Sequence, residues 1–305
     1  MNNDRIQEIL DLMEEARLDY FLISDPQSIA YCTGYYNDPH ERMFVFMISK
    51  HGNHTLFMND LFYLDHDLDV NIVWHKDGQD AIQTIVDEMH FPGRIGIDKN
   101  WASHFLLDLM KKLPDAKYIN ASPCVDLVRM KKDLQEQVLM IESSKINDAV
   151  MEEIIPFIQE GVTEKQLAKK LDELFFNHHS TCYGAIVAFG KNAADPHHEN
   201  DDTLLRKGDC VLIDMGCVYK GYCSDMTRTF FYEGILEEEI KVYEIVKKSN
   251  EAAEAMIKPG VKLSDIDKCA RKVISDEGYG KYFTHRLGHF IGRDVHEYGD
   301  VSSVN

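Results

Sequence analysis

The sequence has little positive charge and no long apolar run. Its 305 residues include 33 Lys and Arg against 52 Asp and Glu, which gives a formal net charge of -19. Nucleic acids and anionic membrane surfaces attract basic patches, so this balance argues against both as partners. No stretch approaches the ~20 apolar residues that are needed to span a bilayer. We therefore expect no nucleic-acid partner and no membrane partner.

Secretory and disulfide signals are also missing. The amino terminus, MNNDRIQEILDLMEEA, is charged at every turn and lacks the apolar segment of a signal peptide. The 7 cysteines are odd in number and include no C-x-x-C pair. This pattern fits reduced thiols that pack as small hydrophobic residues better than it fits a disulfide framework. These absences predict a cytoplasmic protein.

The chain is long enough for two domains, and its pattern changes near residue 125. Before that point, strand-like runs such as YFLIS, MFVFMIS and HTLFM alternate with helical stretches such as DAIQTIVDEMH. This alternation predicts a layered α/β domain at residues 1–125. That region has no phosphate-binding glycine loop and no catalytic cluster, so we expect no reaction site in it. A long helical stretch opens the second predicted domain, residues 126–305.

The second domain contains two similar helical units. One long helical stretch ends at Gly161 and another at Gly260, and each is followed by a valine and a further helix. Thr163 and Gln166 have the spacing of a capping box, and Ser264 is the expected cap in the second unit. Helix, glycine and capped helix is also a common arrangement, so chance similarity stays open beside duplication. A duplication predicts that strands also follow the second unit and complete a core shared with the first.

Two carboxylates interrupt an apolar, strand-like stretch, VLIDMGCVYKGYCSDMTRTFF. Lys220 and Gly221 suit a two-residue hairpin turn, which would place Asp214 opposite Thr227. Asp214 and Asp225 would then be diagonal neighbours on one face, ~7–8 Å apart. A slip of one residue in register would put them on opposite faces.

The hairpin also predicts what surrounds these two carboxylates. Gly216 would face Asp225 and leave the space beside it free of a competing side chain. Two carboxylates this close repel each other unless a cation lies between them. The pair therefore favours a metal site, although a single Asp in a strand more often forms a salt bridge or a turn contact.

Histidines supply further candidate groups. FTHRLGHFIGRDVHE contains His285, His289 and His296, and NAADPHHEN contains His197 and His198. Histidine is the commonest protein metal ligand and transfers protons near neutral pH. The His-x-x-x-His spacing is weak support on its own because it also fits an exposed helix or strand. For NAADPHHEN, a solvated loop is the simplest interpretation.

Together these segments resemble the metallopeptidases of the pita-bread fold, which include methionine aminopeptidases, aminopeptidase P and prolidase. NAADPHHEN, GDCVLIDMGCVYKGYCSDMTRTFF and HRLGHFIGRDVHE occur in that order and at compatible spacings. The region before them resembles the amino-terminal domain of the aminopeptidase P, prolidase and creatinase branch. The resemblance implies an α/β N-terminal domain plus an α+β pita-bread (creatinase/aminopeptidase) C-terminal domain.

The resemblance implies a metal site as well. Asp214, Asp225 and His289 correspond to three of the five ligands of two divalent metal ions, and Asp225 is the ligand that would bridge both. Mixed carboxylate and imidazole ligands suit manganese, cobalt, iron or zinc. The resemblance favours Mn²⁺.

Other residues correspond to substrate-binding positions. The histidines that would line the substrate pocket are His197, His285 and His296, and the expected catalytic residues among them are His197 and His296. We also expect Arg228 to orient Asp225, although a salt bridge elsewhere is equally open for this side chain.

The implied reaction is hydrolysis of the Xaa-Pro bond in dipeptides by a homodimer of the prolidase type, acting on a small peptide with proline at the second position. Similar proteins take their two other metal ligands from glutamates beyond this motif, whereas Glu297 is the only glutamate after these histidines. We therefore expect an incomplete second domain, without its C-terminal strands, and impaired activity. The alternatives are an aminopeptidase P that acts on longer peptides, a creatinase-like C–N hydrolase and a non-catalytic binding module.

Overall fold

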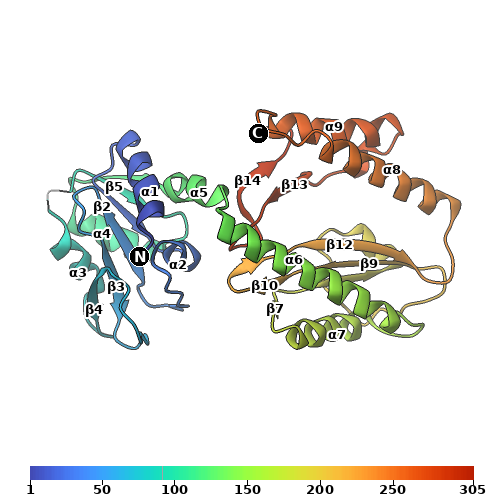
Figure 1. The fold of residues 1–305 in the computed structure, drawn as a ribbon, viewed down its shortest axis with the longest axis horizontal. Helices are drawn as coiled ribbons and strands as arrows, with labels where there is room; N and C mark the ends of the chain where they lie inside the picture. Colours follow the sequence, from blue (N-terminus) through green and yellow to red (C-terminus); the bar gives the residue numbers. More distant parts are fainter. Residues whose placement is uncertain (91) are drawn as a thin grey trace. The chain divides into compact units, whose positions relative to one another are not determined.

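The computed structural model describes residues 1–90 and 92–305, which form two compact units. The first unit is Met1–Lys131 and the second is Lys132–Asn305. Figure 1 labels their helices and strands and colours the chain from blue to red along the sequence. Among the helices of the described residues, none combines the length and the apolar character that a membrane span requires.

The first unit is a mixed six-stranded sheet with the order β4-β3-β2-β1-β5-β6 (Figure 1). The neighbours β1–β2 and β2–β3 are antiparallel and the others are parallel. The strands are β1 Tyr20–Ile23, β2 Val45–Ser49, β3 Thr55–Asn59, β4 Asn71–His75, β5 Arg94–Ile97 and β6 Lys117–Asn120. The helices are α1 Asn3–Glu15, α2 Pro26–Thr33, α3 Ala81–Glu88, α4 Ser103–Lys112 and α5 Ser122–Met130.

Each face of this sheet packs against its own hydrophobic core. Along β1, Phe21 and Ile23 join the core that includes residues of α1, α2 and α5. Tyr20 and Leu22 point the other way and join the core that includes residues of α3 and α4. Burial on both faces explains why YFLI, the run that forms β1, is apolar throughout instead of alternating. The predicted layered α/β architecture is confirmed.

The second unit combines two helical pairs with small antiparallel sheets. Its helices are α6 Leu134–Ile154, α7 Glu164–Asn177, α8 Glu237–Glu254 and α9 Leu263–Asp276, with 3-10 turns η1 Ile155–Phe157, η2 Gly190–Ala194 and η3 Gly280–Tyr282. Its strands are β7 Thr181–Cys182, β8 Ile186–Phe189, β9 Cys210–Met215, β10 Cys217–Tyr219, β11 Tyr222–Cys223, β12 Met226–Phe231, β13 Gly288–Phe290 and β14 Glu297–Val301. The sheet orders are β11-β10-β7, β12-β9-β8 and β13-β14. Helices α8 and α9 lie side by side (Figure 1).

The helix boundaries of the second unit follow local chemistry. The capping box of Thr163 and Gln166 is confirmed at the start of α7. Helix α6 ends at Ile154 and not at Gly161, because Pro156 lies in the 3-10 turn that follows and has no N–H group to continue the helical hydrogen bonds. The cap predicted at Ser264 is wrong, because α9 begins at Leu263 and its N-cap is Lys262.

The second helical pair matches the predicted repeat only in part. The N-cap of α9 is Lys262, which has no side-chain cap hydrogen bond. Gly161 and Gly260 both have left-handed backbones, with φ of 83° and 88°. Strands β13 and β14 follow α9, as a duplication requires, but they pair with each other and not with β9 or β12.

The chain from β9 to β12 forms the predicted hairpin. Lys220 and Gly221 have φ of 49° and 82°, and two positive values are the signature of a type I′ turn. Tyr219 pairs with Tyr222 on either side of this turn. Farther along, Asp214 in β9 pairs with Thr227 in β12, so the predicted register is confirmed.

Candidate metal and substrate site

The hairpin brings its two carboxylates into electrostatic contact. Thr227 Oγ1 donates a hydrogen bond of 2.8 Å to Asp214 Oδ1 across the strand pair. Burial raises the pKa of Asp225, the negative charge of Asp214 raises it further, and His289 and His296 oppose this shift. The side chain of Asp225 therefore lies within the field of one carboxylate and two imidazoles.

Gly216 is essential to the packing beside Asp225. A Cβ atom at this position would lie 1.9 Å from Tyr183 Oη and 2.1 Å from the carbonyl oxygen of Ser224. Tyr183 Oη donates to that carbonyl at 2.7 Å. Burial, and then the charge of Asp225, raise the pKa of Tyr183. The space expected to be free beside Asp225 is thus filled by a tyrosine hydroxyl that the sequence does not reveal.

We expect Gly216→Ala to destabilise the second unit. The added methyl group would force Tyr183 or the main chain at Ser224 to move, and overpacking of this kind costs ~1–3 kcal/mol. Urea unfolding measures the loss. Gly234→Ala is the matched control. A Cβ atom at Gly234 would meet only Gly208, with its Cα at 3.5 Å and the Gly208 N at 3.8 Å, which is ordinary van der Waals contact. Equal stability of the two variants would contradict this interpretation of Gly216.

His289, in β13, lies against Asp225. Its Nε2 is 3.6 Å from Asp225 Oδ2, and its Nδ1 is 3.1 Å from the carbonyl oxygen of Phe290. A carbonyl only accepts, so Nδ1 carries the proton, and the Nε2 that faces the carboxylate is unprotonated in the neutral ring. This tautomer is the one that can ligate a metal through Nε2.

The other predicted histidines, His197, His285 and His296, lie in the same region as this pair. The ring centroids of His289 and His296 are 4.3 Å apart, and those of His197 and His285 are 6.2 Å apart. Partial desolvation lowers the pKa of His296, as do the positive charges of His289, Arg286 and His285, whereas Asp225 raises it. The structure thus gathers residues from the NAADPHHEN loop, the hairpin and the segment around β13.

Arg228 does not contact Asp225. It pairs with Ile213 across the strands, one residue beyond Thr227, so its side chain leaves β12 on the opposite face from Thr227. Its Nη1 donates to the carbonyl oxygen of Thr227 at 2.8 Å. The role predicted for Arg228, orienting Asp225, is therefore wrong.

Glu164, the first residue of α7, anchors the loop that carries His197. Its side chain is 0% exposed. Both carboxylate oxygens accept two hydrogen bonds each: Oε1 from Phe189 N at 2.8 Å and Asn192 Nδ2 at 2.9 Å, and Oε2 from His198 Nε2 at 2.6 Å and Asp201 N at 3.0 Å. Glu164 thus holds the loop at several points along its length.

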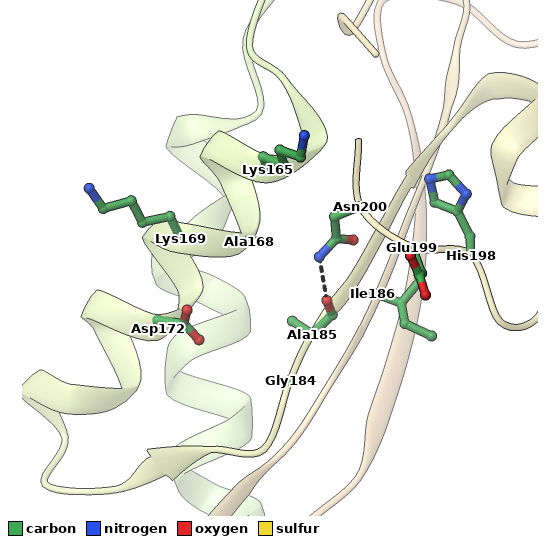
Figure 2. Close-up of a pocket in the computed structure, with 10 residues that line it drawn as sticks. All are labelled: Lys165, Ala168, Lys169, Asp172, Gly184, Ala185, Ile186, His198, Glu199 and Asn200. Atoms are coloured by element: carbon green, nitrogen blue, oxygen red, sulfur yellow. Dashed lines mark hydrogen bonds between the residues drawn. The ribbon is translucent and has the colours of Figure 1, made fainter. Parts of the chain in front are cut away.

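The same loop covers the edge of β8. Asn200 Oδ1 accepts from Val187 N at 2.7 Å, and its Nδ2 donates to the carbonyl oxygen of Ala185 at 2.7 Å. Figure 2 shows the second of these bonds, with His198 farther along the loop. An uncovered strand edge leaves main-chain groups unpaired, and Asn200 satisfies those of β8 at this point. A pocket of about 580 Å³ opens beside this contact.

Glu164, His198 and Asp201 also have ligand-type atoms within 4.8 Å of one another. A metal ion there would compete with four protein donors that already occupy the Glu164 oxygens. A buried carboxylate that is fully hydrogen-bonded is stable without an ion. We therefore interpret this cluster as the anchor of the loop.

We expect Glu164→Ala to destabilise the second unit strongly. It would leave several donors without an acceptor, and each buried donor left unsatisfied costs ~1–3 kcal/mol. Urea unfolding and limited proteolysis of the loop measure the effect. Glu173→Ala is the control on the same helix, because the Lys170–Glu173 ion pair is exposed and such pairs contribute little. An intact loop in Glu164→Ala would contradict the anchoring role.

Comparison with known proteins agrees with this geometry. Residues 138–305 match the model of metallopeptidase family M24, and residues 5–131 match that of the creatinase/prolidase N-terminal domain. The chain belongs to metallopeptidase family M24. The fold predicted from the sequence, a creatinase-type N-terminal domain followed by a pita-bread domain, is confirmed.

Similar M24 proteins include peptidases and dipeptidases. An uncharacterized peptidase of Staphylococcus aureus is 32% identical over 310 residues, which cover 99% of this chain and 87% of that protein. A dipeptidase from Pyrococcus horikoshii OT3 matches with a TM-score of 0.89 and 34% identity, over 98% of this chain and 85% of that one. An Xaa-Pro dipeptidase from Bacillus anthracis matches with a TM-score of 0.89 and 26% identity, over 98% and 84%.

Membership in a metallopeptidase family implies a divalent metal ion, and the residues of this M24 chain fit one. Two ligand atoms ~2.1 Å from one ion lie about 3–3.4 Å apart, depending on coordination geometry. The 3.6 Å between His289 Nε2 and Asp225 Oδ2 is close to this separation. An unprotonated imidazole nitrogen and a carboxylate oxygen are also ligand types that divalent transition metals bind.

Proposed function

We propose that this M24 peptidase is a metal-dependent dipeptidase that hydrolyses Xaa-Pro bonds. The observation that carries the proposal is the 3.6 Å approach of His289 Nε2 to Asp225 Oδ2, with Asp214 on the same face of the hairpin. The Bacillus anthracis relative, an Xaa-Pro dipeptidase, supports this substrate class. The substrate would be a small peptide with proline at its second position.

Asp214, Asp225 and His289 would hold two divalent ions, with Mn²⁺ as the first choice and Asp225 shared between the ions. Bound ions would supply Lewis-acid polarisation of the peptide carbonyl and a nucleophile at neutral pH.

The histidines His197, His285 and His296 would bind the substrate. All three side chains are exposed, so their polar atoms are available to a ligand. His285 Nδ1 is 2.7 Å from the carbonyl oxygen of Arg286, to which it must donate, and Nε2 is the atom left for the substrate. A positioned imidazole can donate to the scissile carbonyl or accept a proton from the attacking group.

The chain loaded with Mn²⁺ tests the proposal directly. We expect slow, metal-dependent release of proline from Ala-Pro, in keeping with the impaired activity expected from the sequence, and still less cleavage of Ala-Ala. Cleavage of Ala-Pro-Gly but not of Ala-Pro would indicate an aminopeptidase P. Hydrolysis of creatine without metal would indicate a creatinase-like enzyme, and binding of Ala-Pro without turnover would indicate a binding module.

A further inference from the structure

Two charged side chains of α9 hold the segment that leads into β13. Asp267 is 0% exposed, and its Oδ2 accepts a hydrogen bond of 2.7 Å from Arg271 Nε. A buried carboxylate needs such a partner because desolvation disfavours its charge. The two residues lie one helical turn apart, so the helix itself fixes their relative position.

The pair binds the main chain on both sides of His285. Arg271 Nη1 donates to the carbonyl oxygen of Phe283 at 2.8 Å, and Nη2 donates to that of His285 at 2.5 Å. The amide of Leu287 donates to Asp267 Oδ1 at 3.2 Å. These contacts fix main-chain groups at alternate residues. A planar guanidinium can hold two carbonyls in a set geometry, which the ammonium group of a lysine cannot reproduce.

An aromatic contact adds to the hydrogen bonds that hold this segment. The guanidinium carbon of Arg271 lies 4.3 Å from the centroid of the Phe283 ring, a cation–π arrangement. The His285 side chain is exposed, and its ring faces that of His197 at 6.2 Å. The ring direction is set by the hydrogen bond from His285 Nδ1 to the carbonyl oxygen of Arg286 at 2.7 Å, and Arg286 lies in the main-chain segment that Arg271 and Asp267 hold.

We propose that Asp267 and Arg271 are positioning residues that aim His285 into the substrate site. This inference rests on the proposed function, in which His285 binds the peptide. The hydrogen bonds and the ring contact of the pair go to each other, to main-chain groups and to the Phe283 ring. Removing the pair should therefore alter turnover while the bound metal stays unchanged.

Arg271→Met is the main test. We expect kcat/KM for Ala-Pro to fall by about 10–100-fold, because a displacement of roughly 1 Å in a catalytic geometry can cost on the order of 10²-fold. Arg271→Lys should be intermediate, since one ammonium group cannot serve both carbonyls. Lys272→Met is the matched control. It breaks the Lys272–Asp276 ion pair, which has the same spacing on an exposed part of α9, and it should leave kcat/KM unchanged.

A double-mutant cycle with His285→Ala separates positioning from a general structural effect. If the pair acts through His285, Arg271→Met should cost less than about 3-fold once His285 is gone. A merely structural role predicts the same loss in both backgrounds and would overturn the proposal. Metal content and the urea midpoint are measured for each variant. If Arg271→Met fails to fold, Arg271→Lys takes its place in the cycle.

A readout without turnover keeps the two proposals distinguishable. The NMR signal of the His285 ring, assigned by its loss in His285→Ala, should shift in Arg271→Met and stay in place in Lys272→Met. An unmoved signal would overturn the positioning role even if activity fell. If the unmodified chain with Mn²⁺ does not cleave Xaa-Pro dipeptides, the proposed function fails, and the ring signal alone decides whether the pair positions His285.

Discussion

Asp225→Ala is expected to abolish proline release from dipeptides and to lower the amount of bound metal, and Asp214→Ala is expected to do the same. The two carboxylates share a face of the hairpin, and burial and Asp214 both raise the pKa of Asp225. Like charges in such a setting are stable as anions only with a cation between them. Removing either one would delete a proposed ligand, so the bound metal should fall and the activity should be lost.

Metal content by mass spectrometry and proline release measure this prediction. Asp276→Ala is a suitable control, because this carboxylate forms an exposed ion pair with Lys272 on α9. Asp225→Asn keeps the shape of the side chain and removes only its charge, so it should lose metal as Asp225→Ala does. Wild-type activity and metal content in both alanine variants would remove Asp214 and Asp225 from the site.

His197→Ala and His296→Ala are expected to lose rate by roughly 10²–10⁴-fold, as positioned acid-base or oxyanion-stabilising groups do. Their metal content should change little, because they would act on the substrate. His289→Ala should instead lose metal, since its Nε2 lies beside Asp225. Turnover and metal content are compared across the three variants. Metal loss in His197→Ala or His296→Ala, with metal retained in His289→Ala, would reverse these assignments.

The features that the sequence predicts well depend on local chemistry. The turn at Lys220 and Gly221 specifies its own backbone, and through it the register that pairs Asp214 with Thr227. Thr163 likewise caps α7 through neighbours in the sequence. The residues that specify a turn or a helix cap lie within a few positions of one another, so a single sequence is enough to predict such features.

The features that the sequence misses depend on contacts between distant segments. Nothing near Gly216 indicates that Tyr183 fills the space beside it. Asp267 and Arg271 have a recognisable spacing for an ion pair, but only the fold reveals that they hold the chain around His285. The early end of α6 is different, because Pro156 is a visible signal that the long helical pattern obscures.

The hairpin limits the insertions and deletions that the chain can accept during evolution. Its register is continuous from the Tyr219–Tyr222 pair to the Asp214–Thr227 pair. One residue gained between Tyr222 and Asp225 would turn the carboxylate to the opposite face, and a second would turn it back. Related sequences that keep both carboxylates on one face should therefore change the hairpin arms in steps of two residues and keep the two-residue turn, because the turn sets the register.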